Sequence, residues 1–248
     1  MTWGVCSAIL RKKKGAVSMA GYKIETHLHT PIISPCGRLT PEQLVEGYLR
    51  AGFSAITVTD HYHSDAFRHA GIDPEGKDAF HAFLEGYRAV CRAAEGTPLR
   101  VYYGAELRFR GCGNDYLLFG FPEELLQNPQ EVWAMGIVRF SELARSAGAL
   151  LIQAHPYRAY CLPVDPALLD GVEAVNRHDV HENRNDLSIA YAKRYGLLMT
   201  GGSDCHHPED VGRGGIEAQW LPENSMELAK LLRQGAFRIL GNDSGMEL

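Results

Sequence analysis

Residues 197–206, LLMTGGSDCH, are the stretch from which the rest of the chain is best interpreted. The apolar run at 197–199 predicts a short buried strand, which ends in the GGS of residues 201–203. Asp204 and His206 follow two residues apart, so in an extended backbone both side chains point to the same side. A carboxylate oxygen and a neutral imidazole nitrogen suit Zn²⁺, Mn²⁺ or Fe²⁺. The stretch therefore predicts a strand that ends in part of a metal site.

Four other predicted strands end in side chains that can bind a metal. These strands cover residues 22–29, 54–59, 100–105 and 149–154. In a barrel of alternating strands and helices the carboxyl ends of the strands meet at one mouth, so residues far apart in sequence become neighbours there. The side chains at these four ends are His27 and His29, Asp60 and His61, Glu106, and His155.

Helix signals between the strands support this arrangement. Thr40 is expected as the N-cap and Pro41 as the first residue of a helix that ends near Ala51. Residues 63–74 look irregular. Further helices are expected at 77–95, 129–147, 183–195 and 223–234, and further strands at 115–121, 171–176, 212–220 and 236–240. The pattern predicts a single α/β barrel domain over residues 21–242, after a disordered or over-annotated leader (1–20) and before a tail (243–248).

Composition narrows the class of protein. With 248 residues the chain is long enough for one large barrel, and its net charge of −5 gives no electrostatic reason to expect nucleic acid as a partner. Six scattered cysteines without a CxxC motif favour a reducing, cytoplasmic compartment. No apolar run approaches the roughly 18 residues of a membrane helix. The oligomeric state is not indicated.

The order HxH (27–29), TDH (59–61), strand-end Glu106, AHP (154–156) and GSDxH (202–206) resembles the PHP (polymerase and histidinol phosphatase) family of metal-dependent phosphoesterases over residues 22–215. The resemblance implies a distorted (β/α)7, TIM-like barrel that holds two or three divalent ions. The ligands it implies are His27, His29, Glu106 and Asp204 for the first ion, Glu106 and His155 for the second, and His61 and His206 for the third. It also implies that a metal-activated water, held near Glu106 and Asp204, attacks the phosphate ester.

Two positions depart from the family pattern. The loop after the first HxH commonly supplies His or Asp, whereas this chain has Cys36, whose thiolate would favour zinc. The second ion often has another His on the following strand, where this chain has Asn114 and Asp115. Asp115 is the expected substitute for the second ion, and Cys36 is the candidate for the third. Asp60 is expected to orient the neighbouring His61 imidazole or, as an alternative, to bind metal itself.

Basic and polar residues near the predicted mouth suit a phosphate ester. The guanidinium groups of Arg158, Arg108 and Arg213 can bind phosphate oxygens bidentately, and Asn176 and His178 follow another strand end. The expected activity is hydrolysis of a small phosphate ester, most simply a phosphomonoester. The alternatives are a non-catalytic metal-binding PHP module, or a nuclease or phosphodiesterase, which would require a basic groove.

Overall fold

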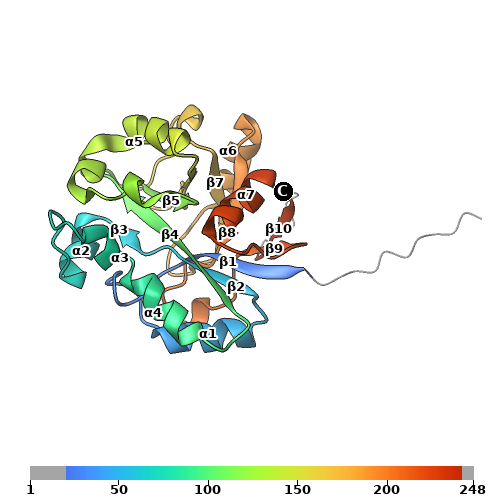
Figure 1. The fold of residues 1–248 in the computed structure, drawn as a ribbon. Helices are drawn as coiled ribbons and strands as arrows, with labels where there is room; N and C mark the ends of the chain where they lie inside the picture. The colour runs from blue at the N-terminus through green and yellow to red at the C-terminus, as the bar shows by residue number, and fades with distance from the viewer. Residues whose placement is uncertain (1–20, 242–248) are drawn as a thin grey trace, which may run out of the picture.

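Residues 21–241 are described by the computed structural model, so the expectations for residues 1–20 and 243–248 lie outside the described part. One ten-stranded sheet forms the framework (Figure 1). Its strands are β1 (Tyr22–Leu28), β2 (Ala55–Val58), β3 (His61–Tyr62), β4 (Arg100–Arg108), β5 (Asp115–Phe119), β6 (Leu150–Gln153), β7 (Gly171–Asn176), β8 (Leu198–Gly202), β9 (Ile216–Ala218) and β10 (Phe237–Ile239).

The sheet curls into a nearly closed barrel. Its strand order is β10-β9-β1-β2-β4-β5-β6-β7-β8, and β3 pairs with β4 off this path. Just beyond the end of β8, Cys205 meets β1 in an isolated bridge to Leu28, with the amide of His29 donating to the carbonyl of Cys205 at 3.0 Å. The predicted α/β, TIM-like barrel is therefore confirmed.

Helices surround the sheet on its outside (Figure 1). Thr40 caps the first helix as predicted, because its hydroxyl accepts from the amide of Gln43 while the Gln43 side chain accepts from the amide of Thr40. The helices are α1 (Pro41–Arg50), α2 (Ser64–Ala70), α3 (Ala79–Phe83), α4 (Glu85–Ala94), α5 (Pro129–Ser146), α6 (Asn185–Tyr195) and α7 (Ser225–Gln234). Within the described residues no helix is long and apolar enough to cross a membrane.

The structure corrects two helix predictions. Residues 63–74 are not irregular, because α2 occupies much of this segment. Its N-cap is an unusual one, the ring Nδ1 of His63, which accepts from the amide of Ala66 at 3.3 Å. The single helix predicted over 77–95 is two helices, α3 and α4, which meet at Leu84.

Three strand predictions also need correction. Strand β4 continues past Glu106 to Arg108, and β5 runs antiparallel to both β4 and β6. Because β5 is reversed, its first residue rather than its last lies at the mouth. In β1 the pairing register shifts between Glu25 and Leu28. Ile24 and Leu28, which regular strand alternation would place on one face, therefore pack into different apolar clusters.

Candidate metal centre

The predicted ligands converge at one end of the barrel. Short parallel pairing of β3 with β4 places His61 directly opposite Glu106, which explains how two residues far apart in sequence become neighbours. A pocket of about 320 Å³ opens above them. It is lined by Cys36, His61, Glu106, Arg108, Asp115, His155, Arg158, His178, Val180, His181, Asp204, His206 and His207.

The first of three overlapping ligand groups consists of His27, His29 and Asp204. The Nε2 atoms of His27 and His29 lie 3.3 and 3.1 Å from the same oxygen, Oδ1 of Asp204. Glu106 completes the group, since its Oε1 lies 3.4 Å from Nε2 of His27. All four side chains are buried. These are the residues that the family resemblance implies for one ion.

Several atoms here are close together without forming hydrogen bonds. His27 Nε2, His61 Nδ1 and Glu106 Oε2 are buried and have no hydrogen-bond partner among the described residues. His61 Nδ1 lies only 2.7 Å from Glu106 Oε2, but the two groups are not aligned for a hydrogen bond. Buried polar atoms are nearly always paired in proteins. Unpaired nitrogen and oxygen donors that converge in this way fit a divalent cation.

The second group consists of Glu106, Asp115 and His155. His155 Nε2 lies 3.1 Å from Glu106 Oε1 and 4.0 Å from Asp115 Oδ2. Both oxygens of Asp115 already accept hydrogen bonds from Arg108, each at 2.6 Å. Asp115 is thus in place beside the other two residues, but its carboxylate is occupied by a guanidinium. Arg108 therefore binds Asp115 instead of presenting a free fork to the pocket.

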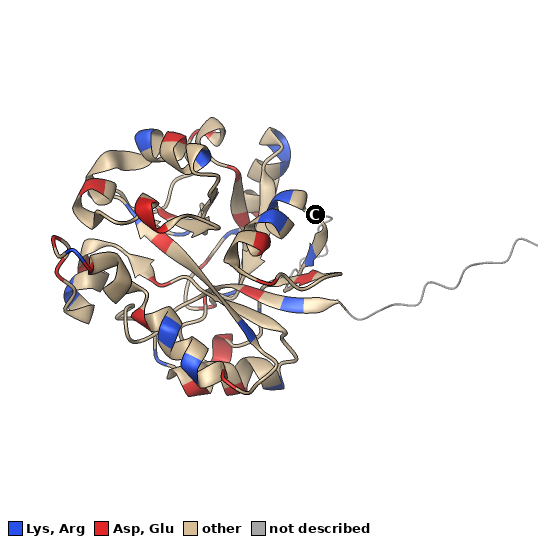
Figure 2. Ribbon diagram, in the orientation of Figure 1, with Lys and Arg blue, Asp and Glu red and all other residues tan. Residues whose placement is uncertain are grey.

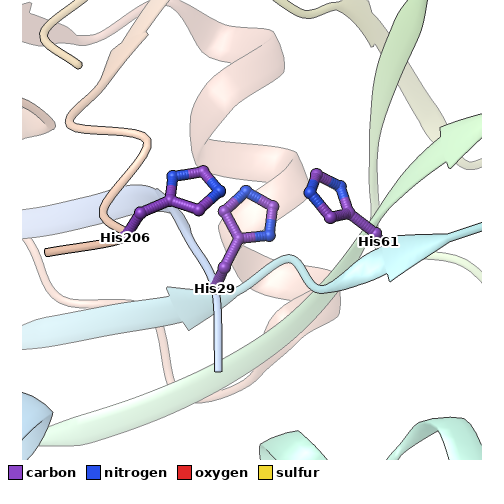
Figure 3. Close-up of side chains that lie close together, drawn as sticks. All are labelled: His29, His61 and His206. Carbon is purple, nitrogen blue, oxygen red and sulfur yellow. The ribbon is translucent and has the colours of Figure 1, made fainter. Parts of the chain in front are cut away.

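The third group consists of His29, His61 and His206, drawn in Figure 3. The ring centroid of His29 lies 4.3 Å from those of both His61 and His206. Cys36 joins them, with its Sγ 3.2 Å from Nε2 of His61. Burial alone would raise the pKa of the Cys36 thiol, but hydrogen bonds to His206 and His61 lower it to about 6. His29, which the resemblance places with the first ion only, is shared between two groups.

Charge within the centre favours ionised carboxylates. Burial alone would raise the pKa of Glu106, but the neighbouring His27 and His61 hold it well below its ordinary value. The pKa of Asp204 is also well below its ordinary value, because the charges of His27 and Arg158 outweigh the effect of its burial. An ionised carboxylate is the form that a cation requires.

Glu173 contacts two of the proposed ligands, His27 and His155, from the side away from the pocket opening. It was not assigned a role from the sequence. Its Oε1 lies 2.8 Å from Nδ1 of His27, and its Oε2 accepts from the amide of His155 at 3.2 Å and from the Asn176 side chain at 2.8 Å. A carboxylate on Nδ1 directs Nε2 of the same imidazole toward the ligand group. The position of Glu173 on the strand β7 was predicted, but nothing in the sequence shows which way its side chain points.

Asp60 does not make the contact expected of it. Its carboxylate accepts hydrogen bonds from the Thr30 amide, the Thr30 hydroxyl and the Ser34 hydroxyl, each at 2.7 Å, rather than holding the imidazole of His61. Ser34 in turn lies 3.3 Å from Nδ1 of His29. Burial, only partly offset by the hydrogen bonds from Thr30 and Ser34, raises the pKa of Asp60 to about 6. The aspartate therefore orients His29 through Ser34.

Of the residues expected to bind substrate, some line the pocket and others lie outside it. Arg158 lines the pocket and donates to Asp204 Oδ2 at 2.7 Å and to Asn176 Oδ1 at 3.0 Å. Asn176 is buried beneath the pocket and positions its neighbours. Arg213 does not line the pocket and pairs with Asp179 instead.

A histidine wall borders the pocket beside Arg158. It consists of His178, His181 and His207, all of which line the pocket. His178 is fixed by Asp210, whose Oδ2 lies 3.2 Å from its Nδ1. His207 and Asp210 were missed by the sequence reasoning, although their position directly after the GSDxH motif was a usable signal.

Comparison with known proteins relates this centre to a family. A family model described as PHP-associated matches residues 182–236. No curated protein matches the sequence.

Three solved structures share the fold. PsfC from Pseudomonas syringae has a TM-score of 0.63 at 17% identity, covering 91% of this chain and 93% of that one. A two-domain protein from Bacteroides vulgatus, containing a predicted PHP-like metal-dependent phosphoesterase, also scores 0.63 at 17% identity, covering 88% of this chain and 64% of that one. The lesion-specific endonuclease PfuEndoQ from Pyrococcus furiosus scores 0.52 at 13% identity, covering 89% of this chain and 58% of that one.

This chain thus spans less than two thirds of the length of two of these three proteins. At these identities the likeness concerns the fold alone, while the family match concerns the sequence of the C-terminal quarter. Residues 182–236 are thus similar in sequence to a PHP-associated family, and the chain shares the barrel fold of the three solved structures.

Proposed function

We propose that the protein is a metal-dependent phosphoesterase that hydrolyses a small phosphomonoester. The observation that carries this proposal is the set of buried, unpaired donors on His27, His61 and Glu106 at the base of a pocket. Two or three bound divalent cations (Zn, Mn or Fe) would polarise a phosphoryl group, lower the pKa of a water molecule and neutralise charge on the leaving oxygen. The ligand roles given to the individual residues belong to this proposal.

Arg158 is the residue best placed to hold the phosphate. It is largely buried at the pocket wall, and three hydrogen bonds to Asp204, Asn176 and Asn183 fix its guanidinium. A fixed guanidinium loses little freedom when it binds a phosphate oxygen. The dianion of a monoester offers three non-bridging oxygens to the cations and to Arg158, whereas a diester offers two and needs room for a second substituent.

Size and charge favour a small ester over a nucleic acid. The pocket volume of about 320 Å³ lies at the lower end of the range for small-molecule sites. The net charge is −5, and Lys and Arg are interspersed with Asp and Glu over the outer helices (Figure 2). A polyanionic strand would need a continuous basic groove. The nuclease and the non-catalytic module remain as alternative outcomes of the experiment.

The test compares kcat/KM for matched aryl phosphate monoesters and diesters. We expect the monoester to react faster. We expect Arg158→Ala to lower kcat/KM for the monoester by a factor equivalent to about 1.5–3 kcal/mol of transition-state stabilisation, the scale of one charged hydrogen bond. Arg213→Ala is the matched control, because Arg213 lies outside the pocket. Both variants are compared at saturating metal, and their metal content is measured, because Arg158 also donates to the proposed ligand Asp204. A preference for the diester, or equal effects of the two substitutions, would contradict the assignment.

A further inference from the structure

The seam between β1 and β8 is where the barrel closes and where two of the proposed ligands meet. No regular ladder joins these two strands in the described structure, and the bridge between Leu28 and Cys205 lies beyond the end of β8. His27 lies on one side of this seam and Asp204 on the other. Two backbone hydrogen bonds of this bridge join the strands beside Asp204, from the His29 amide to the Cys205 carbonyl at 3.0 Å and from the Cys205 amide to the His27 carbonyl at 3.1 Å. The separation of 3.3 Å between His27 Nε2 and Asp204 Oδ1 also depends on the contacts of the residues that precede Asp204.

The backbone at the seam is held in an uncommon conformation. Asp204 has a φ of 51°, in the left-handed region that residues other than glycine rarely adopt. Such a conformation persists only where the surrounding contacts enforce it. The seam is also tight, because a Cβ atom at Gly202 would lie 2.5 Å from the Cβ of His27. The Cys205 bridge holds the chain after Asp204, and the Thr26 hydroxyl donates to the Gly201 carbonyl at 2.8 Å, which leaves residues 202–203 between these two attachments.

Glu25 makes the further contacts that hold Ser203, the residue directly before Asp204. Its side chain is fully buried, and its Oε1 accepts from the amides of Thr26 at 2.9 Å, His27 at 3.0 Å and Ser203 at 3.0 Å. Its Oε2 accepts from the hydroxyls of Ser203 at 2.6 Å and Tyr48 at 2.8 Å. One carboxylate thus binds the backbone of β1 at His27 and, across the seam, both the backbone and the side chain of Ser203.

We infer that Glu25 is a positioning residue that fixes the backbone around His27 relative to Ser203 and Asp204. The side chain contacts no pocket and takes no part in the proposed ligand groups. Its effect on metal affinity rests on the proposed function, whereas its hold on residues 203–204 belongs to the fold without metal. Removal of Glu25 should therefore loosen the seam and, through Asp204, weaken the first ligand group.

The experiment uses the full chain with three substitutions. Glu25→Ala removes all five contacts, and Glu25→Gln retains an oxygen for the amides and an amide group for the two hydroxyls. Leu228→Ala is the matched control, because Leu228 is fully buried in the apolar cluster of α7 and contributes nothing to the ligand groups. Binding of Co²⁺ is followed by its visible spectrum and by competition with a chelator. Hydrogen–deuterium exchange of residues 201–207 is measured on metal-free protein.

Glu25→Ala should weaken Co²⁺ binding by about 10- to 100-fold, as is usual for residues that support a ligand, and should alter the cobalt spectrum. It should also speed exchange at residues 201–207. Glu25→Gln should restore both properties to within about threefold of the wild type. Leu228→Ala should lower the melting temperature while leaving the cobalt spectrum and affinity unchanged, which separates positioning from general loss of stability.

If Glu25→Ala does not fold, Glu25→Asp gives the same comparison, since it keeps the charge but is too short to reach Ser203. Wild-type affinity, spectrum and exchange in the folded Glu25 variants would overturn the inference. Failure of the wild-type protein to bind Co²⁺ would instead contradict the proposed metal centre, and the exchange measurement would then decide the role of Glu25 alone.

Discussion

The first and second ligand groups are built from the same kinds of side chain but are prepared differently. In the first group, His27 and His29 approach one oxygen of Asp204, and the Nε2 atom of His27 has no hydrogen-bond partner. In the second group, both oxygens of Asp115 are bound by Arg108. Arg158 also binds Asp204, but only at Oδ2, so Oδ1 stays directed at the two imidazoles. The first group is therefore arranged in advance for a cation at Oδ1, whereas in the second group the ion pair with Arg108 must be released before Asp115 becomes available.

The removal of Asp204 should have the largest effect. Asp204→Ala should abolish binding of the first ion and reduce phosphoesterase activity by about 10³-fold or more, since the group loses its shared oxygen and several kcal/mol of stabilisation. Asp115→Ala should reduce activity less, because its carboxylate is already engaged by Arg108. Metal content and kcat/KM are measured for both variants. A greater loss from Asp115→Ala would reverse the ranking of the two groups.

Glu173→Ala should have the next largest effect. Without the carboxylate that contacts Nδ1 of His27, this imidazole is no longer held in one orientation. The affinity of the first ligand group for its ion should therefore fall by about 10- to 100-fold. Metal affinity is measured by competition with a chelator. Glu217→Ala is the control, since Glu217 pairs with Arg238 and belongs to none of the three ligand groups. Equal affinities in the two variants would show that Glu173 does not orient His27.

Arg108→Met tests the second group directly. This substitution frees both oxygens of Asp115 while keeping an apolar stem of similar length, so the second ion should bind more tightly by about three- to tenfold, the scale of a partly exposed ion pair. The stepwise titration of metal-free protein with Mn²⁺ measures the change. Unchanged or weaker binding of the second equivalent would mean that Asp115 is not a ligand or that Arg108 moves aside without cost.

Thr40→Ala should have the smallest effect and serves as a reference for both groups. Loss of the N-cap of α1 should lower the free energy of unfolding by about 1 kcal/mol, as measured by urea denaturation. The affinity for either ion should not change, because Thr40 lies outside the three ligand groups. A change in metal content would show that global stability, rather than local geometry, controls the centre.

The sequence predicted the elements that follow local rules. The Thr40 cap and the positions of most helices and strands depend on neighbouring residues and can be recognised in a single chain. His27, Glu106 and Asp204 meet at one mouth as the barrel prediction required, although β4 continues past Glu106 to Arg108.

Features that depend on distant contacts could not be predicted. The reversal of β5 depends on which strands lie beside it, yet this reversal is what brings Asp115 to the mouth. The ion pair between Arg108 and Asp115 follows from that pairing, since the two residues face each other across the β4–β5 ladder. In the sequence, Glu25 and Glu173 cannot be distinguished from other strand residues. Only the closed barrel shows that Glu173 contacts His27 and that Glu25 contacts Ser203, next to Asp204.

The most direct test of the central claim is a metal analysis of the purified protein combined with hydrolysis of a phosphomonoester panel before and after chelation. We expect two or more transition-metal ions per chain, loss of hydrolysis when they are removed, and recovery when Zn²⁺, Mn²⁺ or Fe²⁺ is restored. Protein made in metal-replete medium that contains no stoichiometric metal, or hydrolysis that survives complete chelation, would contradict it.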